Sequence, residues 1–187
     1  MYNTNEFRKG LKVELDNDPY LMVDSQFVKP GKGQAFCRVR LKNLINGRVV
    51  DRTYKSGEKI KKADVVEQEM QFLYNQGDEY HFMNSETYEQ VVIDKDNLGD
   101  AWKYLSEGLL CTVLFHNNLP ITVEVPNFVV LEITQCEPGV RGDTATGATK
   151  PVTLSTGYTV TVPLFIEQGE RLKIDTRTGQ YVERAKE

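Results

Sequence analysis

Apolar and polar residues alternate in several runs along the chain, and this period of two predicts strands rather than helices. The pattern is first seen over 11–15, and it is clearest over 35–42. Successive side chains of a strand point to opposite faces, so one face of 35–42 is apolar and the other is mostly cationic. The apolar face comprises Ala35, Cys37, Val39 and Leu41, and the opposite face comprises Phe36, Arg38, Arg40 and Lys42.

Turn-forming residues separate these strands at short intervals in the first third of the chain. Residues 16–19 read Asp-Asn-Asp-Pro and predict a turn, after which extended sequence resumes from Tyr20 to Val28. Asn46-Gly47 lies between two apolar pairs, which is the strongest short signal for a β-hairpin. The first third therefore predicts a small, twisted, SH3-like barrel.

The middle third predicts two further hairpins with one short helical segment between them. Asp100 is expected to N-cap this segment, with Trp102 and Leu105 on one side because they are three residues apart. A short helix within a five-stranded barrel is typical of the OB fold. The expected hairpins pair 68–74 with 79–83, and 109–115 with 119–125.

The last third also predicts strands and turns, and it indicates a second OB-like barrel. Alternation is clear over 129–134, and residues 137–150 are expected to form a loop rich in Gly, Thr and Asp. Further strands are expected at Pro151–Leu154, Tyr158–Val162, Leu172–Asp175 and Gln180–Arg184. We thus predict an all-β chain of three small barrels in tandem, with domains at 1–62, 63–126 and 127–187.

Charge is distributed unevenly along the chain. The formal net charge is −4, which by itself argues against a nucleic-acid partner. Residues 1–62 carry 14 Lys and Arg against 7 Asp and Glu, residues 63–125 carry 2 against 12, and residues 126–187 carry 7 against 8. A polyanion such as RNA would therefore be contacted mainly by the first third, and the acidic middle third is typical of a solvated surface.

Cysteine and histidine give no sign of a metal or disulfide site. Cys37, Cys111 and Cys136 are widely spaced and form no Cys-x-x-Cys pair, and His81 and His116 are isolated. We expect no metal and no cofactor. The sequence has no apolar run long enough for a membrane span and no signal-peptide core, so we expect a cytoplasmic protein with no membrane partner.

The stretch Val28–Phe36 places a lysine between two glycines directly after a proline. Pro30 fixes its own φ, and Gly31 and Gly33 are expected to take positive φ, so Lys32 should lie at the apex of a hairpin loop. The same residues are equally typical of an ordinary solvated turn that happens to contain a lysine. A P-loop is excluded by spacing, because Gln34 follows Gly33 and no Ser or Thr follows the lysine, and a dinucleotide fingerprint lacks its third glycine.

Several separated motifs resemble one family in register. The run Lys-Pro-Gly-Lys-Gly-Gln-Ala-Phe at 29–36 is similar to the modification loop of bacterial elongation factor P. The similarity continues over essentially the whole chain. It includes 38–44, Tyr80–Asn84, Gly142-Asp143-Thr144 and the segment from Lys150 to Gly169.

This resemblance implies a translation factor with no catalytic residue of its own. It implies an L-shaped monomer that binds the ribosome beside peptidyl-tRNA, between the peptidyl and exit sites, and relieves stalling at consecutive prolines. Lys32 would be the modified residue, presented by a tip loop of Lys29, Pro30, Gly31, Gly33 and Gln34. Contacts with ribosomal RNA, messenger RNA at the exit site or tRNA would come from Arg38, Arg40, Lys42, Gly99, Asp100, Gly142, Asp143, Tyr181 and Arg184.

The sequence does not identify the group attached to Lys32, and it leaves two alternative functions open. Lysine-tipped members of the family carry either a β-lysyl group, added by an enzyme resembling a lysyl-tRNA synthetase, or an aminopentanol, and Gln34-Ala35-Phe36 favours the first. One alternative function is a general RNA-binding OB protein, which would need aromatic residues exposed on its barrel faces. The other is an enzyme, although the sequence contains no evident Ser-His-Asp, Cys-His or paired-carboxylate arrangement.

Overall fold

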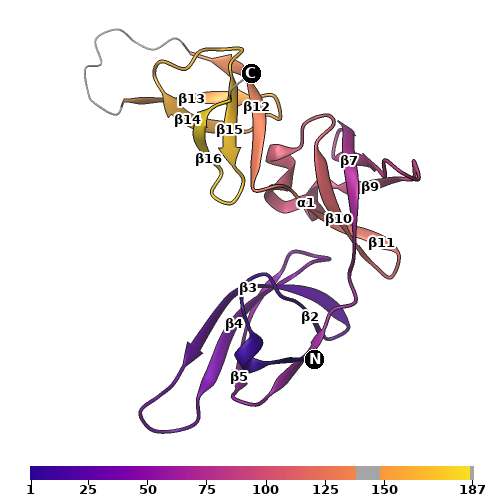
Figure 1. Ribbon diagram of the computed structural model, residues 1–187, viewed down its shortest axis with the longest axis vertical. Coiled ribbons are helices and arrows are strands. Elements are labelled where there is room, and N and C mark those ends of the chain that lie inside the picture. The colour runs from indigo at the N-terminus through magenta and orange to yellow at the C-terminus, as the bar shows by residue number, and fades with distance from the viewer. Residues whose placement is uncertain (138–147, 186–187) are drawn as a thin grey trace. The chain divides into compact units, whose positions relative to one another are not determined.

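Three sheets account for most of the described chain (Figure 1). The structure is a computed structural model, and it describes residues 1–137 and 148–185. Two compact units divide these residues: one comprises 1–68 and 113–122, and the other comprises the described residues of 69–112 and 123–187. The described part of the chain contains no helix that is long and apolar enough to cross a membrane.

The first sheet has six strands in the order β1-β6-β2-β3-β4-β5. A tight turn at Asp16 and Asn17, both with positive φ, joins β2 to β3, so the turn is two residues long and shorter than the sequence predicts. The predicted apolar face of 35–42 is confirmed, because Cys37, Val39 and Leu41 are buried. The elements are β1 (Tyr2–Asn3), a 3-10 helix η1 (Thr4–Glu6), β2 (Lys12–Leu15), β3 (Asp18–Val28), β4 (Phe36–Asn43), β5 (Val49–Lys55) and β6 (Lys59–Lys62).

The second sheet has five strands in the order β11-β10-β7-β8-β9. Both predicted hairpins are confirmed, although β7 is longer than expected and a bulge interrupts its pairing with β8 between Phe72 and Tyr74. Within the first unit, Leu44 packs against Leu114 and Ile121 of the β10–β11 hairpin. The strands are β7 (Val66–Gln76), β8 (Glu79–Met83), β9 (Gln90–Asp94), β10 (Leu110–His116) and β11 (Leu119–Glu124).

The helical segment between β9 and β10 begins earlier than the sequence predicts. Helix α1 (Lys95–Leu98) is capped by Asp94, whose carboxylate accepts a hydrogen bond from the Asp96 N–H at 3.0 Å. Gly99 then adopts a positive φ of 59° and separates α1 from the 3-10 helix η2 (Gly99–Tyr104). The prediction that Asp100 is the N-cap is therefore wrong, because Asp100 lies inside η2.

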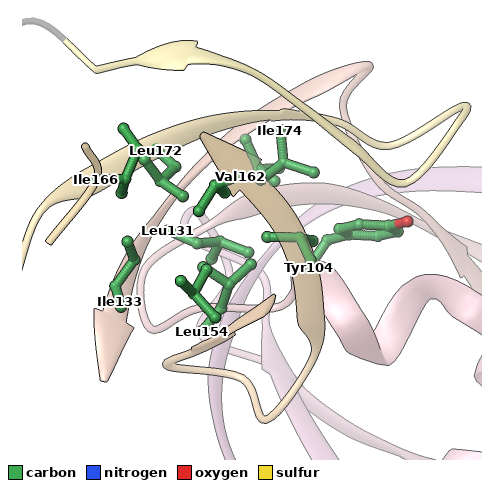
Figure 2. Packing of buried hydrophobic residues seen from close by; sticks show 11 residues of the cluster. Tyr104, Leu131, Ile133, Leu154, Val162, Ile166, Leu172 and Ile174 are labelled. Carbon is green, nitrogen blue, oxygen red and sulfur yellow. The ribbon is translucent and has the colours of Figure 1, made fainter. Parts of the chain in front are cut away.

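The third sheet has five strands in the order β14-β13-β12-β15-β16, and its strand predictions are confirmed to within two residues. Its core is almost entirely aliphatic, and Figure 2 shows the Tyr104 ring at one end of this cluster with its hydroxyl pointing away from the aliphatic groups. Tyr104 thereby joins η2 to the last sheet. The strands are β12 (Phe128–Cys136), β13 (Thr149–Leu154), β14 (Thr159–Pro163), β15 (Arg171–Asp175) and β16 (Gln180–Arg184).

The three cysteines differ in burial and should therefore differ in reactivity. Cys37 and Cys111 are buried, whereas Cys136 is only partly buried, and burial raises the pKa of the Cys111 thiol to about 12. Since the thiolate is the nucleophile, iodoacetamide at pH 8 should modify Cys136 first and reach Cys37 and Cys111 only after denaturation. Peptide mass spectrometry measures this order, and equal rates at Cys111 and Cys136 in the folded protein would contradict it.

Candidate functional site

Residues 29–35 form the loop at the end of the β3–β4 hairpin, where Val28 and Phe36 make the last strand pair (Figure 1). Lys32 is exposed in the middle of this loop, as sequence reasoning predicts. Gly33 has a φ of +106°, which strongly favours glycine, whereas Gly31 has no positive φ. The prediction of positive φ at both glycines is therefore correct for Gly33 and wrong for Gly31. A single glycine in this conformation suffices because the loop spans seven residues.

The base of the loop is fixed to the turn that follows β5. The Ser56 N–H donates to the Ala35 carbonyl at 2.9 Å, and the Gln34 side-chain amide donates to the Ser56 carbonyl at 3.3 Å. The Gly57 N–H in turn donates to the Thr4 hydroxyl at 3.3 Å. These contacts hold the C-terminal end of the loop against the barrel, while its exposed apex presents the Lys32 side chain to solvent.

Below the loop, the outward face of β4 carries the predicted cationic residues, but acidic side chains interrupt it. Arg40 pairs with Asp51 on β5, with 3.0 Å between Nε and Oδ1, and this hydrogen bond together with the charge of Asp51 raises the pKa of Arg40. Asp24 lies opposite Arg40 on β3. Sequence reasoning missed both carboxylates, because neither is near Arg40 in the sequence.

Arg38 has a different environment from Arg40. Its guanidinium carbon lies 5.3 Å from the centre of the Phe36 ring, which is a cation–π distance. A surface hollow of about 230 Å³ lies here, and Arg38, Arg40 and Arg52 contribute to its lining together with the two acidic side chains. Lys42, the third cation of the predicted row, is half-buried. Arg38 is therefore the residue of this row best suited to contact an anion.

Gly99 and Asp100 are exposed in the second unit. Asp100 pairs with Lys103 at 3.1 Å, and the Lys103 ammonium lies 4.9 Å from the centre of the Tyr158 ring. The Thr156 hydroxyl donates to the Lys103 carbonyl at 2.6 Å. Residues of the β13–β14 turn thus hold η2 in place. No local sequence pattern indicates Lys103, because its partner Tyr158 is 55 positions away.

Tyr181 and Arg184 on β16 do not form one exposed pair. Tyr181 is partly buried and packs against the core of the third sheet. Arg184 is exposed, pairs with Glu170 at 3.2 Å and stacks on the Phe165 ring at 4.6 Å. Gly142 and Asp143 lie outside the described residues. Of the predicted site residues, the structure brings the tip loop and Arg38, Arg40 and Lys42 together on one hairpin.

Family models match the chain in three consecutive segments. Residues 3–60 match the elongation factor P (EF-P) KOW-like domain, residues 65–123 match the EF-P OB domain, and residues 129–184 match the C-terminal domain of elongation factor P. The chain belongs to the elongation factor P family. Family membership makes it a translation elongation factor, and the predicted all-β fold with tandem barrel domains is confirmed.

The comparison with solved structures finds similarity to two other translation factors. This elongation factor is 21% identical to a eukaryotic translation initiation factor 5A from Methanococcus jannaschii, with a TM-score of 0.50 over 66% of this chain and 93% of that chain. A translation initiation factor eIF-5A family protein from Naegleria fowleri ATCC 30863 is 13% identical, with a TM-score of 0.44 over 66% and 94% of the two chains. At 21% identity, the first likeness supports the fold alone.

Proposed function

We propose that this factor binds the ribosome between the peptidyl and exit sites, beside peptidyl-tRNA, and stimulates peptide-bond formation at consecutive prolines. The observation that carries the proposal is the position of Lys32, exposed at the apex of a loop whose base is fixed, in a member of the elongation factor P family. Such a loop can insert a long cationic side chain into a confined site. The factor acts as a monomer in the cytoplasm, where ribosomes translate.

The physical task of Lys32 is to position a reactant, not to perform chemistry. Proline is a constrained secondary amine, so it attacks poorly when the acceptor end of the peptidyl-tRNA is misplaced. Correct positioning of reactants lowers a barrier by several kcal/mol, and effective molarities for well-oriented groups reach about 10⁵ M or more. The ribosome remains the catalyst, and the extended Lys32 side chain steadies the acceptor end.

Modification would extend the reach of Lys32. Its primary amine can accept a β-lysyl group from an enzyme resembling a lysyl-tRNA synthetase, and an exposed loop gives that enzyme access. Intact-mass measurement of the factor purified from its native host tests this directly. We expect a mass increase that maps to Lys32, and an unmodified mass throughout would contradict the modification.

The remaining contacts would position the factor on the ribosome. Arg38, with Arg40 and Lys42, would contact ribosomal or transfer RNA. Tyr181 and Arg184 would provide the RNA contacts of the third sheet. Gly99 and Asp100 would contact messenger RNA at the exit site, and Gly142 and Asp143 would contribute further contacts with the RNA of the ribosome. Co-sedimentation with ribosomes, compared with binding to protein-free RNA of the same length, separates this function from general RNA binding. We expect retention by ribosomes and weak binding to the RNA.

General RNA binding has one observation in its favour. Tyr74 is 52% exposed and stacks on His81, with 4.4 Å between the ring centres, on one face of the second sheet. An exposed stack of this kind can bind a base. The surrounding segment opposes it, because residues 63–125 contain 12 acidic and 2 basic side chains. We therefore favour the ribosome over RNA in general as the partner.

The environments of the two arginines predict different effects on ribosome binding. Arg38→Glu should weaken binding and lower the salt slope by about one unit for the lost phosphate contact. Arg40→Glu should have a smaller effect, because Asp51 already neutralises Arg40. Asp51→Asn should strengthen binding by releasing Arg40. Ribosome affinity measured at several salt concentrations tests this order, with Glu69→Lys as the control, and equal effects of the two arginine variants would contradict it.

A further inference from the structure

A hollow of about 290 Å³ in the second unit, here called the Trp102 hollow, has no part in the proposed function. Its walls come from β7 and β8, from the end of η2 with the turn that follows it, and from the β13–β14 turn. Phe72, Tyr80, Trp102 and Leu105 give it apolar surface. Pockets for small ligands occupy about 300–1,000 Å³, so a hollow of this size suits a single side chain.

Hydrogen bonds join the walls of the Trp102 hollow to one another. The Gly108 N–H donates to the Phe72 carbonyl at 2.9 Å, and the Thr156 hydroxyl donates to the Lys103 carbonyl at 2.6 Å. A bulge leaves Leu73, another lining residue, without a partner on β8, and bulges are over-represented beside functional sites. The hollow is therefore formed before any ligand binds.

The charge around the Trp102 hollow is negative. Of the residues that line it, all of them described by the structure, Glu107 alone carries a charge. Its carboxylate is exposed and has no ion-pair or hydrogen-bond partner among the described residues. Residues 63–125 contain 12 acidic side chains and two basic ones, Lys95 and Lys103, and Lys103 pairs with Asp100. This segment therefore attracts cations and repels phosphate groups.

Aromatic rings beside a carboxylate bind a cation, because the ring faces attract positive charge and the carboxylate pairs with it. Trp102 already contacts one cation within the protein, since the Lys95 ammonium lies 4.2 Å from the centre of its ring. A guanidinium suits the hollow better than an ammonium, because it is planar, stacks on rings and donates several hydrogen bonds. Acceptors for these hydrogen bonds are the side-chain oxygens of Asn75, Ser106 and Ser155.

We propose that the Trp102 hollow holds an arginine side chain of a basic protein that docks on the acidic segment 63–125. This inference goes beyond the proposed function, because it concerns a protein partner and does not involve Lys32. Free arginine suits the site less well, since its carboxylate would be repelled by the acidic segment. An arginine within a protein has no such carboxylate, and basic residues next to it would add to the attraction.

The test uses the full-length factor and a labelled nine-residue peptide that has blocked ends and three arginines. Fluorescence anisotropy measures its binding. A second peptide carries citrulline in place of each arginine, which keeps the shape and removes the charge, and we expect it to bind at least about tenfold more weakly. Trp102 is the single tryptophan and lines the hollow, so its emission should change when the unlabelled arginine peptide binds.

Variants of the factor locate the binding site of the peptide. Glu107→Gln should weaken binding about 2- to 5-fold, as expected for the loss of one exposed ion pair. The matched control is Glu89→Gln, which removes the same charge from an exposed position outside the hollow and should have little effect. Lys95→Gln should strengthen binding, because it removes a positive charge beside the ring.

The tryptophan ring has its own pair of variants. Trp102→Leu should weaken binding about 2- to 30-fold through the lost cation–π contact. Trp102→Phe keeps an aromatic face and should retain most of the affinity, which separates the role of the ring from a defect in folding.

Equal binding of the arginine and citrulline peptides, or binding of neither, would overturn the proposal. Equal losses in Glu107→Gln and Glu89→Gln would show that the whole segment attracts the peptide and that the hollow does not hold it. Free arginine binding as tightly as the peptide would make the hollow a small-molecule site, and weaker binding in Lys95→Gln would indicate an anionic ligand. Either result would reject the proposal. The proposed function would stand in every case, because no ribosome takes part in these measurements.

Discussion

Lys32→Ala should abolish the stimulation of synthesis through consecutive prolines while leaving the fold and most ribosome affinity intact. Lys32 is exposed, so its truncation opens no cavity, and the change in stability should stay within about 0.5 kcal/mol. Binding should survive because one side chain at the edge of a large interface rarely dominates its energy. Activity should be lost because the Lys32 side chain and its modification are the parts proposed to reach the reacting ends.

The measurement is the yield of full-length product from a template with a Pro-Pro-Pro run, relative to a template without one. Lys32→Arg is the matched control, since it keeps the charge but offers no amine to a lysyl-transferring enzyme, and it should also fail. Full activity of Lys32→Ala would refute the role of the loop. Loss of ribosome binding in parallel with activity would make Lys32 an affinity anchor and not a positioning group.

Gly179→Ala should be the more damaging of two glycine substitutions in the third sheet. Gly179 has a φ of +75°, and a Cβ there would lie 2.7 Å from the Tyr158 hydroxyl oxygen and 3.2 Å from that of Tyr104. The Tyr158 hydroxyl donates to the Gly179 carbonyl at 2.9 Å, so the ring cannot move away without breaking this bond. Strain at positive φ costs about 1–3 kcal/mol and the lost hydrogen bond about 1 kcal/mol, so we expect a total of about 2–4 kcal/mol.

Gly157→Ala is the control for the strain alone. Gly157 has a φ of +91°, but a Cβ there would meet nothing within 4 Å. Urea unfolding followed by the fluorescence of Trp102, the single tryptophan, compares the two variants. An equal loss of unfolding free energy in both would show that the contact with the two tyrosines contributes nothing.

Strand positions were predictable from the sequence because alternation is a local property. Gln180–Arg184 is predicted with its observed bounds, and Leu172–Asp175 differs from β15 by one residue. The strands that the sequence missed lack a run of alternation long enough to detect, as β1 and β6 show with two and four residues. The sequence predicts the helical cap at Asp100 instead of Asp94, because both are aspartates near the start of the same segment.

The partners of the site residues were not predictable, because they depend on register. Asp51 neutralises Arg40 only because the β4–β5 turn places these two residues opposite each other. The exposed loop around Lys32 was predictable because Pro and Gly restrict the backbone locally.

If the factor positions the acceptor end of peptidyl-tRNA, it should raise the rate at which a single peptide bond forms between two prolines. Ribosomes carrying a peptidyl-tRNA that ends in proline are mixed with prolyl-tRNA, with and without the factor purified from its native host. We expect a faster single-turnover rate with the factor, and an unchanged rate when the same ribosomes carry peptidyl and aminoacyl groups without proline. An unchanged proline rate at a factor concentration that saturates the ribosomes would contradict it.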